Sequence, residues 1–184
     1  MDKKLNISEA YLRPGPPFGG SCLPKEIRAL QKLTGDKNRY PLLHAILPSN
    51  EQRKQEIFDF ILTHKKKSIG ILGISFKSGT DDMRESPTLE MIKKLQQQNY
   101  ALYFYDPNIK KSELLPLNEA YLNEQFPEFF NHFCSSLQEI AAKADLLLLT
   151  TNDPSYTDIL PYLTDKHTVI DFYGLLEKST HLWE

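Results

Sequence analysis

The residues with the clearest chemical potential lie in one short run, Phe18-Gly19-Gly20-Ser21-Cys22-Leu23-Pro24-Lys25. Pro24 suits the first turn of a helix, where its missing N–H costs nothing, so the run places Cys22 beside a helix N-terminus. The helix dipole and the nearby Lys25 ammonium both favour a thiolate, and the glycine pair lets the backbone turn sharply or approach a ligand. The run predicts a nucleophilic Cys22. The competing interpretation is a small buried hydrophobic residue, the commonest state of a free cysteine.

A second run, residues 75–87, combines cations with the start of a helix. Its last two residues, Ser86-Pro87, predict a helix cap and a first helical residue. A helix N-terminus offers unpaired N–H groups and positive potential. Lys77 and Arg84 precede that end, and two cations there suit a diphosphate. The alternative is a structural loop in which the aspartates at Asp81-Asp82 neutralise both cations.

The elements that must position these runs follow from hydrophobic periodicity and from proline and glycine signals. Residues 1–17 are expected to form a loop, Gly35 closes the first helix, and Pro48 should kink or split the second. Strands that alternate with helices predict an α/β fold with a doubly wound, Rossmann-like parallel sheet. The expected helices span 24–33, 41–63, 87–99, 117–125, 137–143 and 156–163, and the expected strands span 68–74, 101–105, 131–134, 145–150 and 168–172.

Two parts are expected, divided near residue 65. Residues 1–64 form a helical segment that carries the cysteine, and residues 65–184 form the α/β domain. The chain has 184 residues, 40% of them hydrophobic, and a formal net charge of −2. This balance offers no basic face for nucleic acid, and no apolar run is long enough to cross a membrane.

The cysteine and histidine content bounds the compartment and the cofactor class. The two cysteines lie in unrelated contexts, which predicts a reducing cytoplasm, with Cys134 as a packing residue. The five histidines are scattered and lack the spacing of a zinc site. The sequence therefore predicts a cytoplasmic protein without a metal centre.

Both runs resemble signature segments of the UDP-glucose/GDP-mannose 6-dehydrogenase family. The first matches over Pro14-Gly15 and residues 18–26, and the second matches over residues 75–87. Residues 5–8 and 10–15 are similar to the GDP-mannose branch of that family in particular. The resemblance extends over essentially the whole chain.

The resemblance implies an enzyme that uses NAD to oxidise the C6 alcohol of a nucleotide-sugar, through an aldehyde, to a carboxylate. Cys22 would add to the aldehyde as a thiohemiacetal, which becomes a thioester that water releases. NAD is expected to contact Lys25 and Arg84, with Asp82 and Glu85 orienting Arg84. The residues expected to contact the nucleotide-sugar are Ala10, Tyr11, Arg13, Pro16, Gly19 and Lys77.

The chain departs from the family pattern at two places in the first run. Glu26 stands where the family has aspartate, and the extra methylene moves its carboxylate far enough to leave its role open. Pro16-Pro17 replaces the glycine or apolar residues usual before Phe18, which stiffens that loop.

The family opens with an NAD-binding half whose glycine-rich turn has the G-x-G-x-x-G spacing, and Gly70-Ile71-Leu72-Gly73 lacks that spacing. The chain is therefore expected to be the C-terminal part of such an enzyme, inactive by itself. The helix over 41–63 is expected to form a homodimer contact, with an ordinary core helix as the alternative. GDP-mannose is the expected substrate. The alternatives are a UDP-glucose 6-dehydrogenase and a non-catalytic module that binds a nucleotide-sugar or dimerises.

Overall fold

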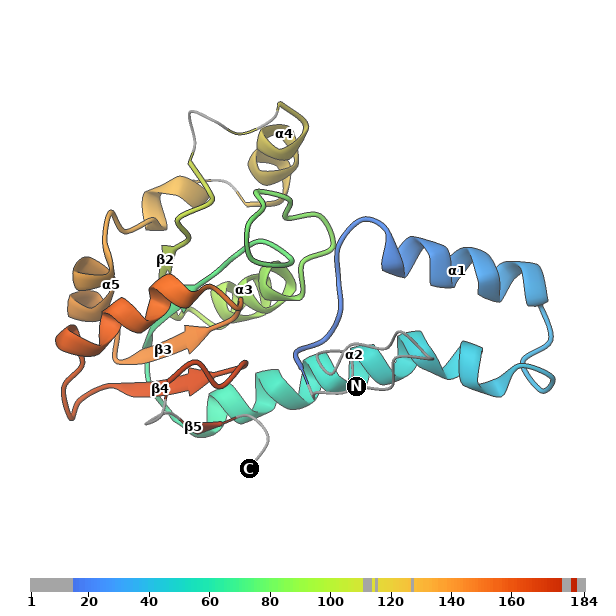
Figure 1. The fold of residues 1–184 in the computed structure, drawn as a ribbon, viewed down its shortest axis with the longest axis horizontal. Helices are drawn as coiled ribbons and strands as arrows, with labels where there is room; N and C mark the ends of the chain where they lie inside the picture. The colour runs from blue at the N-terminus through green and yellow to red at the C-terminus, as the bar shows by residue number, and fades with distance from the viewer. Residues whose placement is uncertain (1–14, 111–113, 115, 127, 177–179, 182–184) are drawn as a thin grey trace, which may run out of the picture.

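A computed structural model describes residues 15–110, 114, 116–126, 128–176, 180 and 181 as a helical arm followed by an α/β unit (Figure 1). Ala10, Tyr11 and Arg13 lie outside the described residues. Their expected role in substrate binding therefore stays a prediction.

The α/β unit is built on one parallel sheet with the strand order β2-β1-β3-β4-β5. Its strands are short apolar runs, and β1 and β3 are almost entirely buried, as expected for a sheet covered on both faces. The chain leaves β1 for β2 on one side and returns to β3 on the other, so the order reverses between β1 and β3. The strands are β1 (Ser68–Leu72), β2 (Ala101–Tyr105), β3 (Leu146–Leu149), β4 (Thr168–Asp171) and β5 (Thr180–His181).

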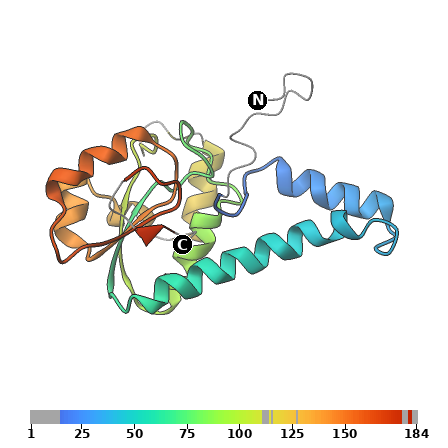
Figure 2. The same ribbon diagram turned by 60° about the horizontal axis from the view of Figure 1, so that its bottom comes forward.

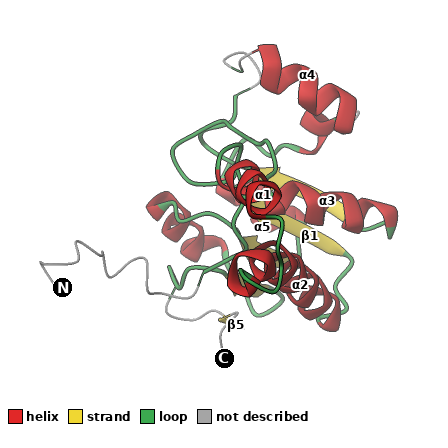
Figure 3. Cartoon of the chain, turned by 90° about the vertical axis from the view of Figure 1, so that its right-hand side faces the viewer, coloured by secondary structure: helices red, strands yellow, loops and turns green. Residues whose placement is uncertain are grey.

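Helices cover both faces of this sheet, as Figure 3 illustrates. One face packs against α2 (Pro41–Thr63), α3 (Pro87–Gln97), α4 (Pro116–Gln125) and the 3₁₀ helix η3 (Phe129–His132). The other packs against α5 (Leu137–Lys143) and the 3₁₀ helix η4 (Pro154–Tyr162). Alternation along β3 divides the two cores, because Leu146 and Leu148 face the first set and Leu147 and Leu149 face the second. The expected doubly wound α/β class is confirmed.

The arm consists of α1 (Leu23–Thr34) and the first half of α2, and it projects away from the sheet (Figures 1 and 2). The second half of α2 enters the core through Ile57, Phe58 and Ile61. The expectation that Pro48 might split this helix was wrong. Proline removes one i→i−4 hydrogen bond, and in a 23-residue helix with Pro48 exposed that loss does not end the helix.

The expected edge strand over 131–134 was also wrong. Residues 131 and 132 belong to η3, and Phe133 pairs with the sheet through one isolated bridge to Phe104. The cause is aromatic packing, because Phe129 and Phe133 lie 5.1 and 5.8 Å from Phe104 between ring centroids. The rings of Phe129 and Phe133 can both reach Phe104 because the chain turns between them. In a continuous strand, two residues four positions apart would lie too far apart to share one partner.

No helix in the described part of the chain is long and apolar enough to cross a membrane. Among the same residues, no group of three or more His, Cys, Asp and Glu side chains is arranged to hold a metal ion.

Candidate active site

The two signature runs lie against each other at the start of α3. A Cβ on Gly19 would lie 2.5 Å from Pro87 Cδ and nearer still to the Glu85 carbonyl oxygen. Gly20 has a φ of +86°, its N–H donates to the Glu85 carbonyl at 3.3 Å, and its backbone faces the ring of Phe76. The glycine pair therefore has a packing role here, because only residues without a Cβ allow this approach. The ligand contact expected at Gly19 stays a prediction.

Cys22 occupies the cap position of α1, which begins one residue earlier than expected, at Leu23. Its carbonyl accepts the N–H of Glu26 at 2.9 Å, and the thiol is exposed beside the Ser21 hydroxyl, 3.8 Å from Sγ. The alternative of a buried hydrophobic residue does not hold for Cys22. It does hold for Cys134, which is buried and whose pKa is raised by that burial.

Arg84 is held by Asp82 in a two-pronged pair, with its Nε 2.9 Å from Oδ1 and one terminal nitrogen 2.8 Å from Oδ2. These hydrogen bonds lower the pKa of Asp82 below its ordinary value. The same terminal nitrogen of Arg84 reaches the Ser21 hydroxyl at 3.5 Å. The Ser21 hydroxyl therefore lies between the Arg84 guanidinium and the Cys22 thiol and contacts both.

The expectation that Glu85 helps to orient Arg84 was wrong. Glu85 has a φ of +50°, and its carboxylate pairs instead with Arg28 of α1 at 2.6 Å. This ion pair ties α1 to the loop that precedes α3, although both side chains are substantially exposed and the pair contributes little stability.

The two lysines expected at the site have different surroundings. Lys25 forms an exposed ion pair with its neighbour Glu26 at 3.1 Å. The Glu26 carboxylate therefore neutralises the Lys25 ammonium, which was expected to favour the Cys22 thiolate. Lys77 is exposed, and its Nζ lies 5.2 Å from the centroid of the Phe76 ring. In the described residues, the structure brings Cys22 together with Ser21 and Arg84.

Two buried polar residues that sequence reasoning missed fix the backbone of this site. Asn50 of α2 exchanges two hydrogen bonds with the backbone of Phe18. Asp106, which follows β2, accepts the N–H of Ile74 at 2.8 Å and thereby anchors the start of the 75–87 run. Their positions gave some signal, because a helix interior disfavours asparagine and an aspartate directly after a buried strand often caps a loop.

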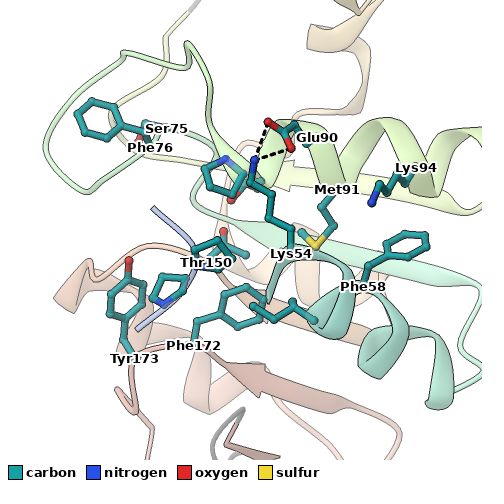
Figure 4. A pocket seen from close by; sticks show the side chains of 15 residues that line it. Lys54, Phe58, Ser75, Phe76, Glu90, Met91, Lys94, Thr150, Phe172 and Tyr173 are labelled. Carbon is teal, nitrogen blue, oxygen red and sulfur yellow. Dashed lines mark hydrogen bonds and ion pairs between the residues drawn. The ribbon is translucent and has the colours of Figure 1, made fainter. Parts of the chain in front are cut away.

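A pocket lies beside this loop, where β1, β3 and β4 end (Figure 4). Ligands bind at this edge of doubly wound sheets, near the point where the strand order reverses. Figure 4 shows the Lys54–Glu90 ion pair, 2.8 Å long, on one wall and Phe172 and Tyr173 across from it. Burial raises the pKa of Tyr173, so its hydroxyl stays protonated at neutral pH. The lining also includes Pro16, Pro17, Ser75, Phe76, Met91 and Thr150.

The described residues do not form a dinucleotide cradle of their own. Residues 73–86 make a long loop between β1 and α3, whereas a dinucleotide fingerprint joins strand and helix by a short glycine-rich turn. Gly19 packs against Pro87 at the start of α3, and Lys25 and Arg84 are each held by a carboxylate. The NAD contacts expected at these two cations stay predictions.

Comparison with known proteins places the whole chain. Residues 70–178 match the UDP binding domain, and residues 1–52 the central domain, of the UDP-glucose/GDP-mannose dehydrogenase family. The GDP-mannose 6-dehydrogenase of Pseudomonas aeruginosa is 36% identical over 98% of this chain and 42% of its own length. That of Pseudomonas putida is 37% identical over 98% of this chain and 41% of its own length. A UDP-glucose 6-dehydrogenase of Rickettsia bellii is 34% identical over 82% of this chain and 34% of its own length.

Solved structures agree with this placement. A ternary complex of the Pseudomonas aeruginosa GDP-mannose dehydrogenase superposes with a TM-score of 0.85 at 36% identity, over 97% of this chain and 41% of that one. A UDP-glucose dehydrogenase from Pyrobaculum islandicum shares the fold, with a TM-score of 0.69 at 22% identity over 94% of this chain and 38% of its own. The chain spans about two-fifths of the length of the GDP-mannose relatives it matches. Since one family domain alone accounts for residues 70–178 of 184, the chain belongs to the UDP-glucose/GDP-mannose dehydrogenase family, as the two runs predicted.

Proposed function

We propose that this chain is the cysteine-bearing and nucleotide-sugar-binding part of an NAD-dependent nucleotide-sugar 6-dehydrogenase that oxidises GDP-mannose to GDP-mannuronate. The observation that carries the proposal is the packing of Gly19 and Gly20 against Phe76 and Pro87. It joins the exposed Cys22 to the loop that lines the pocket. The similarity to GDP-mannose 6-dehydrogenases over 98% of the chain supports GDP-mannose over UDP-glucose as the substrate.

The pocket has the composition of a nucleotide site. Phe76 and Tyr173 offer aromatic faces on which a base can stack, and Phe172 closes the floor of the pocket from the core. Lys77, next in the chain to Phe76, carries an exposed ammonium for the diphosphate. Lys54 is a poor candidate for that role, because Glu51 and Glu90 already neutralise it.

The chemistry assigned to Cys22 is nucleophilic. An aldehyde has no good hydride to give until a nucleophile adds to its carbonyl carbon, and a thiolate supplies that nucleophile. Addition gives a thiohemiacetal, loss of a hydride gives a thioester, and water then releases the carboxylic acid and the thiol. NAD⁺, when bound, accepts the hydride in each of the two oxidations. Arg84 reaches the Ser21 hydroxyl that lies beside the sulfur, with its own charge balanced by Asp82.

Three further points belong to the same proposal. The dinucleotide is held mainly by a segment outside this chain, with Lys25 and Arg84 contributing contacts, so the chain alone does not turn over. The arm forms a homodimer contact, since Leu33 and Leu42 are 82% and 81% exposed whereas the second half of α2 is covered by the chain's own core. Light scattering that finds only monomer would contradict the dimer. The free thiols agree with a cytoplasmic location.

The function is tested by product analysis of Cys22→Ala in the complete enzyme with GDP-mannose and NAD. The first oxidation does not need the thiol, so aldehyde is expected to form while the uronic acid disappears. Uronic acid made at the native rate would remove Cys22 from the mechanism. No oxidation of GDP-mannose by the native enzyme, with UDP-glucose oxidised instead, would move the substrate to the alternative.

A further inference from the structure

The backbone just before Cys22 is held by the side chain of Asn50. The Phe18 N–H donates to Asn50 Oδ1 at 3.0 Å, and Asn50 Nδ2 donates back to the Phe18 carbonyl at 2.9 Å. Asn50 is only 9% exposed and lies 32 residues from Phe18 in the chain. The side-chain oxygen and the NH₂ group of Asn50 thus satisfy both the N–H and the C=O of Phe18. A neighbouring β-strand would otherwise supply these two hydrogen bonds.

This contact completes a clamp on the cysteine segment. Asn50 holds Phe18 to α2 from one side, and on the other side the glycine pair is packed on Phe76 and Pro87. Between these two supports the chain has no freedom to shift along α2 before it reaches Cys22. A helix interior disfavours asparagine, which competes with the backbone for hydrogen bonds. Helix formation therefore does not explain this residue, whereas the clamp does.

We propose that Asn50 is the positioning residue that fixes the Phe18–Cys22 backbone and so sets the place of the Cys22 thiol relative to Arg84. The role assigned to the thiol rests on the proposed function, whereas the clamp itself does not. Asn50 touches no reacting atom in this assignment, and it acts only through Phe18.

The sharpest perturbation is Asn50→Asp, which keeps the shape and exchanges the NH₂ for an oxygen. Above its pKa the new carboxylate still accepts the Phe18 N–H, but its second oxygen meets the Phe18 carbonyl and repels it. When protonated, the carboxyl can donate to that carbonyl and restores both hydrogen bonds. Burial and the facing Phe18 carbonyl both oppose the charged form, and burial alone raises the pKa of a buried carboxyl by up to about 3–5 units from the roughly 3.9 of an exposed aspartate. The clamp is therefore expected to open at pH 8 and to close again at pH 4.5.

The ionisable side chains near residue 50 are few, so a pH effect in Asn50→Asp can be assigned to the new carboxyl group. Residues 15–18, which line the same pocket as Asn50, carry no ionisable side chain. On α2 itself, Arg53 pairs with Glu56, and Lys54 pairs with Glu51 and Glu90. Gln52→Glu is the matched control, because it adds the same charge two residues away on the same helix. Gln52 is exposed and its side chain donates to Glu56, so the repulsion that the new carboxylate adds lies within α2.

The experiment is amide hydrogen exchange of the chain at both pH values, expressed as protection relative to the free-peptide rate at that pH. At pH 8, Asn50→Asp is expected to lose about tenfold protection at Phe18 and the following amides, the order of one buried hydrogen bond left unmade. Protection elsewhere in the sheet should stay unchanged, and the loss should disappear at pH 4.5. Gln52→Glu should match the native chain at both pH values.

Three results would overturn the proposal: native protection in Asn50→Asp at pH 8, a loss of equal size at pH 4.5, or the same local loss in Gln52→Glu. Should the variant fail to fold, the native chain still decides the matter, because a Phe18 amide that exchanges at the free rate contradicts the clamp. A second readout joins the clamp to catalysis. In the complete enzyme at pH 8, kcat for aldehyde oxidation should fall about tenfold with little change in the KM for the nucleotide-sugar. An unchanged kcat with an open clamp would overturn the positioning role alone.

Discussion

The contact between the two signature runs predicts a sharp difference between two glycine-to-alanine substitutions in the same loop. In Gly19→Ala the new methyl group would collide with the Glu85 carbonyl oxygen and lie 2.5 Å from Pro87 Cδ. Neither neighbour can move aside easily, because one belongs to the backbone and the other to a proline ring at the start of α3. In Gly15→Ala the methyl group meets nothing within 4 Å.

The magnitude follows from the cost of forcing extra volume into a packed contact, about 1–3 kcal/mol. The displaced segment also loses the Gly20 N–H to Glu85 hydrogen bond, worth about 1 kcal/mol. For a chain of this size, 1 kcal/mol shifts the melting temperature by about 2–4 °C. Gly19→Ala is therefore expected to melt about 4–16 °C below the native chain. Gly15→Ala should melt at the native temperature or slightly above it, since it restricts only the unfolded chain.

Differential scanning calorimetry of the native chain and the two variants measures the difference. Each substitution adds one methyl group to the same loop, so the comparison isolates the contact with α3. Equal melting temperatures for the two variants would refute the packing role of Gly19. So would a Gly19→Ala variant that melts with the native chain.

Two further predictions concern the same region. Iodoacetamide should label Cys22 rapidly and Cys134 only on unfolding, because the first thiol is exposed and the second is buried, and equal labelling by mass spectrometry would contradict this. Asp82 has a pKa below its ordinary value of 3.8, chiefly through its hydrogen bond to Arg84, so its stabilising contribution is complete above about pH 4 and is lost as the pH falls further. Asp82→Asn should abolish that part of the acid limb in melting curves recorded from pH 2 to 7, and an unchanged limb would refute the assignment.

The helices and strands could be predicted largely because local signals agreed with the tertiary fold. Pro24, Pro41 and Pro87 each lie in the first turn of a helix, and the apolar runs that became β1 and β3 are buried on both faces. The failures arose where tertiary contacts decided the outcome. Residues near Phe133 have strand-like composition, yet the aromatic partners of Phe104 draw them into a 3₁₀ turn.

At the candidate site, residue types could be predicted but partners could not. The sequence indicated Cys22 and Arg84, and the pairing of Arg84 with Asp82 could be predicted because the two lie only two positions apart. The contact of Asn50 with Phe18 and the ion pair of Glu85 with Arg28 join segments 32 and 57 residues apart. Such pairs depend on how the segment before α1 packs on α2 and how α1 meets the loop before α3, which no local pattern in one sequence encodes.

The central claim is that this chain binds a nucleotide-sugar and lacks a dinucleotide site of its own, and isothermal titration calorimetry tests it most directly. Titration of the chain with GDP-mannose is expected to show weak, saturable binding, stronger than that of UDP-glucose and lost in Lys77→Ala. NAD is expected to give no measurable binding, because the described residues lack the short glycine-rich turn of a dinucleotide fingerprint. Saturable binding of NAD, or no binding of either nucleotide-sugar, would contradict the account.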